Sequence, residues 1–133
     1  MIVGVGIDMA TVQFWADALA DPTTSVVEGT FTEGEIADSK AGPVPPAERL
    51  AARFAAKEAF TKAISGGRHG QQPEFDRIDP LDIEIKRDPW GRPQLELHGR
   101  AAALAQRFGV LRTWVSLSHE LNNAIAVVVL EGE

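Results

Sequence analysis

Two carboxylates and one amine stand at positions where they can serve phosphate chemistry. Glu58 and Lys62 are four residues apart in an alanine-rich segment, so on a helix they share one face and can address the same ligand. Asp8 follows the apolar residues 2–7, where a carboxylate must be solvated, paired or bound to a cation. Asp8 and Glu58 offer the hard oxygen ligands that Mg²⁺ prefers, and Lys62 would neutralise phosphate charge and assist a leaving group.

Each of these residues also has a purely structural interpretation. A Glu and a Lys at i and i+4 usually decorate a helix surface, where they contribute only about 0.2–0.5 kcal/mol. Asp8 by itself fits a helix N-cap. His119, at the end of a β-rich stretch, either binds phosphate or holds a turn through its ring nitrogens. The functional interpretation therefore requires the residues to act together.

Composition excludes several classes of protein. The 133 residues carry a net charge of −6, which opposes sequence-independent binding of nucleic acid. Cysteine is absent, so disulfides, thiolate zinc sites and cysteine nucleophiles are excluded. No segment approaches the length that spans a membrane, and residues 1–7 lack the basic start of a signal peptide. We expect one domain, residues 1–133, in the cytoplasm.

The elements that must position these residues are a mixture of strands and helices. Glycine, proline and helix-capping residues set their limits, and Thr32 with Glu35 forms the sequence pattern of a capping box. The predicted elements are strand 2–7, helix 11–19, a short helix after Thr32, the longest helix at 47–65, strands 82–87 and 94–98, helix 101–108, and strands 113–117 and 124–130. This order predicts an α+β fold with helices packed on a mainly antiparallel sheet.

Three motifs occur in the order in which a known family carries them. They are Gly4-Val-Gly-Ile-Asp8, Arg53-Phe-Ala-Ala-Lys-Glu-Ala-Phe-Thr-Lys62 and Val115-Ser-Leu-Ser-His119. Phe31-Thr32 with Glu35, and Asp82-Ile-Glu-Ile with Gly91-Arg-Pro93, extend the match over nearly the whole chain. The chain thus resembles the holo-acyl-carrier-protein synthase family, the small trimeric branch of the 4′-phosphopantetheinyl transferases.

The resemblance implies the 4′-phosphopantetheinyl transferase fold and an enzyme that moves 4′-phosphopantetheine from coenzyme A to a serine of an acyl carrier protein. Asp8 and Glu58 would hold Mg²⁺ against the coenzyme A pyrophosphate while the serine attacks the β-phosphorus and 3′,5′-ADP leaves. Lys62 would assist the leaving phosphate, and Glu58 or a metal-bound water would deprotonate the serine. The coenzyme A contacts implied are Arg53, Lys62, Ser118 and His119. A homotrimer and a role in fatty acid biosynthesis are implied as well.

The first helix departs from the family pattern. Many members carry an acidic residue and an arginine there, on the surface that docks the carrier, whereas residues 9–17 contain no basic residue. Trp114 stands where the family usually has a histidine before Val-Ser. Two acceptors stay open, a free acyl carrier protein or a carrier domain of a fatty acid or polyketide synthase, and the altered first helix gives weight to the second. The docking candidates are basic Arg49, Arg53 and Arg68, or apolar Val12, Phe14 and Trp15.

Two other functions stay open at this point. A regulatory or scaffold protein of the same fold would bind a coenzyme A derivative and turn nothing over. A purely structural trimer subunit would bind no coenzyme A in a magnesium-dependent way. The presence of Asp8, Glu58 and Lys62 together favours the enzyme.

Overall fold

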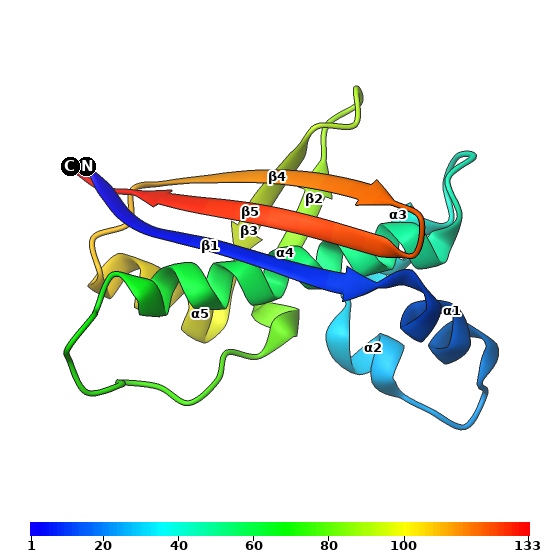
Figure 1. The fold of residues 1–133 in the computed structure, drawn as a ribbon, viewed down its shortest axis with the longest axis horizontal. Coiled ribbons are helices and arrows are strands. Elements are labelled where there is room, and N and C mark those ends of the chain that lie inside the picture. Colours follow the sequence, from blue (N-terminus) through cyan, green and yellow to red (C-terminus); the bar gives the residue numbers. More distant parts are fainter.

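A computed structural model describes residues 1–133 and divides them into two antiparallel sheets and five α-helices (Figure 1). The elements are β1 (Ile2–Thr11), α1 (Val12–Ala20), α2 (Val26–Thr30), α3 (Glu33–Ser39), α4 (Pro46–Gly66), the 3₁₀ helix η1 (Pro80–Asp82), β2 (Ile83–Arg87), β3 (Pro93–Leu97), α5 (Gly99–Arg107), β4 (Arg112–Glu120) and β5 (Asn123–Glu131). The predicted α+β class is confirmed, and no helix is long and apolar enough to cross a bilayer.

The strands form a three-stranded sheet in the order β1-β5-β4 and a separate hairpin of β2 and β3. Both predicted hairpins are present, and every neighbouring pair of strands is antiparallel. The two ends of the chain lie side by side (Figure 1), where the amide of Gly132 donates to the carbonyl of Met1 at 2.8 Å.

Helix α4 runs across one face of the three-stranded sheet and is the element on which both hydrophobic clusters pack (Figure 1). The larger cluster joins its C-terminal half to β2, β3, β5 and α5, and the smaller one joins its N-terminal half to Trp15 and Phe31. Ala10 and Leu117 pack against both clusters. Alanine is both a strong helix former and small, so this sequence makes a helix that other elements can approach closely.

The start of the chain differs from the prediction in two respects. The first strand does not end before Asp8, because its pairing with β5 continues to Thr11, which lies opposite Asn123. Neither Asp8 nor the Thr11 side chain caps α1. Asn122 in the β4–β5 turn does so instead, with its carbonyl 2.9 Å from the amide of Val12 and its side-chain oxygen 2.8 Å from the amide of Gln13.

Candidate active site

Two glycines of β1 bring Asp8 against α4. Gly4, Gly6 and Asp8 share one face of the strand because side chains alternate along it. A Cβ atom at Gly6 would lie 1.9 Å from the carbonyl oxygen of Ala59, and one at Gly4 would lie 1.9 Å from that of Ala63. Since no side chain fits there, only glycine allows the helix backbone to lie directly on the strand. The sequence Gly4-Val-Gly-Ile-Asp8 therefore delivers a carboxylate to the side of α4.

Lys62 of α4 meets that carboxylate. Its ammonium lies 3.1 Å from Oδ1 of Asp8 and 3.3 Å from the carbonyl oxygen of Ile7. The side chain of Asp8 is 23% exposed and that of Lys62 is 58% exposed, so the ammonium remains open to a ligand from solvent. The structure thus brings two of the three predicted catalytic residues into direct contact.

Glu58 lies one helical turn before Lys62 and is half-buried, with no hydrogen bond or ion pair in the chain. Burial raises the pKa of its carboxyl group, and the charge of Asp8 raises it further, while Lys62 and Arg77 oppose that shift. Asp8 and Glu58 are therefore two carboxylates whose charges repel one another. A divalent cation would stabilise both in their ionised form, and this oxygen donor set fits Mg²⁺.

The residues predicted to bind coenzyme A do not share one pocket of a single chain. Arg53 and His119 line the same pocket of about 190 Å³, together with Arg49 and Arg87, whereas Lys62 is absent from its walls. The Arg53 guanidinium is 2% exposed and is paired with Asp38, which leaves its Nε without a partner. Arg53 therefore contributes a buried cation to an ion network with Asp38 and Arg87.

Ser118 and His119 point to opposite faces of the sheet. β4 extends to Glu120, so residues predicted to form a turn continue the strand and alternate in direction. His119 pairs with buried Ala124 and faces α4, where its Nδ1 lies 3.8 Å from Glu48. Ser118 pairs with Ile125 on the outer face.

The other two basic docking candidates, Arg49 and Arg68, already have partners within the chain. Arg49 donates to the backbone carbonyl of Asp38 at 3.1 Å. Arg68 donates to Gln71 at 2.7 Å, and its guanidinium lies 4.3 Å from the ring centre of Phe108. A role for either arginine in binding the carrier stays a prediction.

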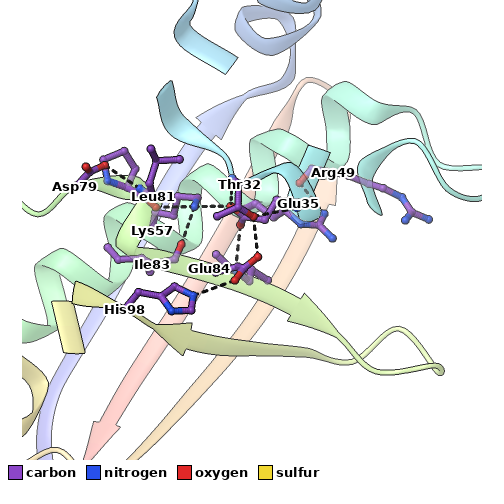
Figure 2. Close-up of polar contacts among 12 residues, drawn as sticks. Thr32, Glu35, Arg49, Lys57, Asp79, Leu81, Ile83, Glu84 and His98 are labelled. Atoms are coloured by element: carbon purple, nitrogen blue, oxygen red, sulfur yellow. Dashed lines mark hydrogen bonds and ion pairs between the residues drawn. The ribbon is translucent and has the colours of Figure 1, made fainter. Parts of the chain in front are cut away.

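The sequence analysis missed a buried ion pair beside the site. Lys57, 1% exposed, lies 2.7 Å from Glu35, which is 0% exposed, and Figure 2 shows the Lys57 side chain reaching from α4 toward Glu35 and the backbone of Ile83. Burial lowers the pKa of Lys57, and the charge of Glu35 opposes that shift. The capping box predicted from Thr32 and Glu35 is present. The sequence did offer one signal for this ion pair. Lys57 stands among alanines of the long helix, and a lysine on the buried side of such a helix needs a partner for its charge.

A second group of metal-type ligands lies on the β2–β3 hairpin. Atoms of Glu84, Glu96 and His98 approach within 4.8 Å of one another. Glu84 already accepts from Thr32 at 2.7 Å and contacts His98 at 3.0 Å, and Glu96 is paired with Lys86 at 3.1 Å. Because these groups satisfy one another, and come from a different sheet than Asp8, they are not the predicted magnesium site.

Comparison with known proteins gives one consistent result. A sequence profile described as the 4′-phosphopantetheinyl transferase superfamily matches residues 4–128. The holo-[acyl-carrier-protein] synthase of Mycobacterium tuberculosis is 43% identical over 130 residues, which cover 98% of this chain and 97% of that protein. The solved structure of the M. tuberculosis acyl carrier protein synthase matches with a TM-score of 0.76 at 40% identity and covers 100% of both chains.

A structure described as a Chronobacterium ammoniagenes ACPS–CoA complex matches with a TM-score of 0.85 at 32% identity, over 98% of this chain and 97% of that one. The match in sequence and the match in fold both run along nearly the whole chain, so the resemblance predicted from the motifs is confirmed. The motif residues Asp8, Glu58 and Lys62 all lie inside the region that the superfamily profile matches. This chain belongs to the 4′-phosphopantetheinyl transferase superfamily.

Proposed function

We propose that this chain transfers the 4′-phosphopantetheine group of coenzyme A to a serine of an acyl carrier protein, with Mg²⁺ bound by Asp8 and Glu58. The transferase activity follows from the family and from relatives that match over nearly their full length. The observation that carries the metal proposal is the convergence of two carboxylates and one exposed ammonium between β1 and α4. A cytoplasmic location and a single domain over residues 1–133 stay predictions.

Each residue of the site has a chemical task in this proposal. Lys62 presents a positive charge to the phosphate that departs with 3′,5′-ADP, because its ammonium is exposed yet anchored by Asp8. Glu58, half-buried and one helical turn before Lys62, accepts the proton of the attacking serine as general base. Bound Mg²⁺ would supply charge neutralisation at the pyrophosphate.

The reaction replaces one phosphorus–oxygen bond with another. The serine oxygen forms a bond to the β-phosphorus of coenzyme A, the bond from that phosphorus to the bridging oxygen breaks, and 3′,5′-ADP leaves with the electron pair. The serine proton passes to Glu58. Mass spectrometry of an apo-carrier incubated with this chain, coenzyme A and Mg²⁺ tests the proposal, since transfer adds the mass of phosphopantetheine to the carrier.

The acceptor in this proposal is a free acyl carrier protein or a carrier domain of a fatty acid or polyketide synthase. The relatives' name, holo-[acyl-carrier-protein] synthase, supports the carrier as substrate. Helix α1 contains no basic residue, and Phe14 on it is 53% exposed. Docking through this helix would therefore rely on apolar contact rather than on charge.

A homotrimer is the proposed assembly, with the outer face of the three-stranded sheet as its interface. Val5 of β1, Val129 of β5 and Trp114 of β4 lie opposite one another in register on this face, and Val5 and Trp114 are 57% and 53% exposed. Ile7 and Met9 continue the apolar surface along β1, at 52% and 58% exposure. Burial of such a surface between subunits would stabilise a small domain.

Light scattering tests the trimer. The parent chain is expected to give a trimer mass at micromolar concentration, and Val127→Lys, in the middle strand of this face, is expected to give a monomer, because a charge buried at the interface has no partner. Gln94→Lys, an exposed position of β3, is the matched control and is expected to leave the trimer intact. A monomer mass for the parent chain contradicts this assembly.

A further inference from the structure

Lys57 is a buried ammonium whose three protons are all used. Its Nζ lies 2.7 Å from Oε1 of Glu35, 2.7 Å from the carbonyl oxygen of Pro80 and 2.6 Å from the carbonyl oxygen of Ile83. An ammonium has three donors, so this set saturates it. The Nζ atom of Lys57 thus connects α4 by hydrogen bonds to α3, to η1 and to the start of β2.

Both carboxylate oxygens of Glu35 also accept hydrogen bonds. Its Oε1 also accepts from the amide of Thr32 at 3.0 Å, and its Oε2 accepts from the amide of Ile85 at 3.0 Å. In Figure 2, Thr32, Glu35 and Lys57 lie in one chain of contacts that continues through Glu84 to His98. Neither partner can move without breaking hydrogen bonds to several backbone groups.

The position of Lys57 on the helix gives this anchoring a consequence for the active site. Glu58 follows Lys57 directly, and Ala59 follows Glu58. Successive residues of an α-helix are about 100° apart around its axis, so Glu58 projects between the side held by Lys57 and the side held by Ala59. Ala59 is the residue whose carbonyl lies against Gly6 of β1. Contacts therefore hold helix α4 on both sides of the Glu58 side chain. Lys57 makes them on one side, and the close approach of Ala59 to Gly6 makes them on the other.

Stability alone does not call for such a pair. A buried ion pair is often no more stabilising than well-packed apolar side chains of similar volume, because both charges lose their hydration. An ion pair with directional hydrogen bonds also fixes the rotation and the axial position of a helix against its neighbours. Apolar side chains do this less well, because they tolerate sliding and rotation. A displacement of a catalytic group by about 1 Å can reduce the rate by about 10²-fold.

We propose that Lys57 is a positioning residue, which fixes the rotation of α4 through Glu35, Pro80 and Ile83 and thereby holds the Glu58 carboxylate at its working separation from Asp8. The inference rests on the proposed function, because it concerns the geometry of the same site. Lys57 itself is buried about 100° around the helix from Glu58, and all three of its hydrogen bonds go to groups of this chain.

The test compares the parent chain with the double variant Glu35→Gln/Lys57→Met, which removes both charges and leaves no lone buried ion. We expect Mg²⁺ affinity, measured by calorimetry in the absence of substrate, to fall by about 10- to 100-fold, the usual loss when a group that orients a metal ligand is removed. We expect kcat to fall by a similar factor while the KM for the carrier changes less than about 2-fold.

Leu104→Ala, a core change in α5 away from the site, is the control for lost stability. It is expected to lower the melting temperature and leave Mg²⁺ affinity unchanged, which separates positioning from general loosening. Should the double variant not fold, Lys57→Arg keeps a cation opposite Glu35 and alters only the hydrogen-bond geometry, and we expect it to lower Mg²⁺ affinity by about 10-fold.

Mg²⁺ affinity and kcat that match the parent in the folded variants would overturn the positioning role. A parent chain that binds Mg²⁺ yet transfers nothing removes the proposed function. The positioning role is then still decided, because the Mg²⁺ affinities of parent and variants can be compared without any turnover.

Discussion

Asp8→Ala and Glu58→Ala are each expected to lower the kcat of phosphopantetheine transfer by about 10³-fold or more, while both variants stay folded. Each change removes one of two carboxylates proposed to bind Mg²⁺, and neither deletes volume from a hydrophobic cluster. Glu58→Gln is expected to fail as well, because the amide keeps the shape and loses the charge. Steady-state kinetics with an apo-carrier measure the effect.

Glu33→Gln, at an exposed carboxylate of α3, is the matched control and is expected to retain parent activity. Parent-like turnover in Asp8→Ala or Glu58→Ala would remove the metal proposal. Melting curves without Mg²⁺ give an independent check of the electrostatics at Glu58. Because the pKa of Glu58 is raised above its ordinary value of 4.5, the folded state binds this proton more tightly than the unfolded state does.

This difference in proton affinity between the folded and unfolded states determines how Glu58 affects stability as pH changes. The contribution of Glu58 to the stability of the metal-free chain falls as pH rises from 4.5 through the raised pKa, so the Glu58 carboxylate is unfavourable at neutral pH. Glu58→Gln is therefore expected to melt slightly higher than the parent at pH 7, and the gain should vanish below pH 4.5. Lower stability of the variant at pH 7 would show that the carboxylate is not under repulsion.

Gly6→Ala is expected to destabilise the chain by about 3 kcal/mol or more and to lower its melting temperature by about 10 °C. The added Cβ would lie 1.9 Å from the carbonyl oxygen of Ala59 and 2.7 Å from the amide nitrogen of Ala63. Backbone atoms of a packed helix cannot move aside as a flexible side chain can, so α4 must separate from β1. Asp8 would then also move away from Lys62, and activity should fall with stability.

Gly29→Ala is the matched control for Gly6→Ala. Gly29 lies in α2, and no atom comes within 4 Å of a Cβ built there, so alanine is expected to leave the melting temperature unchanged or raise it. Both variants are compared at one protein concentration, because an oligomer's apparent stability depends on it. A Gly6→Ala variant as stable as the parent would mean that the close contact of β1 with α4 is not required.

Local patterns in the sequence predicted the parts of the fold that neighbouring residues decide. The capping box of Thr32 and Glu35, the long alanine-rich helix and both hairpins depend on short-range spacing and turn residues, and all are present. The motifs placed Asp8, Glu58 and Lys62 in one site, and the structure adds the direct contact of Lys62 with Asp8. The sequence did not explain why the first motif contains two glycines. The structure does, because Gly4 and Gly6 leave room for the backbone of α4 against β1.

The remaining features depend on contacts between distant segments, which spacing cannot reveal. Asn122 caps α1 from a turn 109 residues further along the chain. Lys57 reaches Glu35, 22 residues away, and the pair could not be distinguished from surface charges without the burial of α4. The predicted coenzyme A residues Ser118 and His119 were placed in a turn, and only the extended β4 separates their directions.

The most direct test of the central claim is the mass of an apo-carrier after incubation with coenzyme A and this chain, with and without Mg²⁺. The proposed function predicts a carrier heavier by one phosphopantetheine group and the release of 3′,5′-ADP in the presence of Mg²⁺, and an unchanged carrier when a chelator removes the metal. Transfer that proceeds equally well in the chelator would contradict the role given to Asp8 and Glu58. A carrier of unchanged mass in the presence of Mg²⁺, across free acyl carrier proteins and synthase carrier domains, would contradict the transferase function itself.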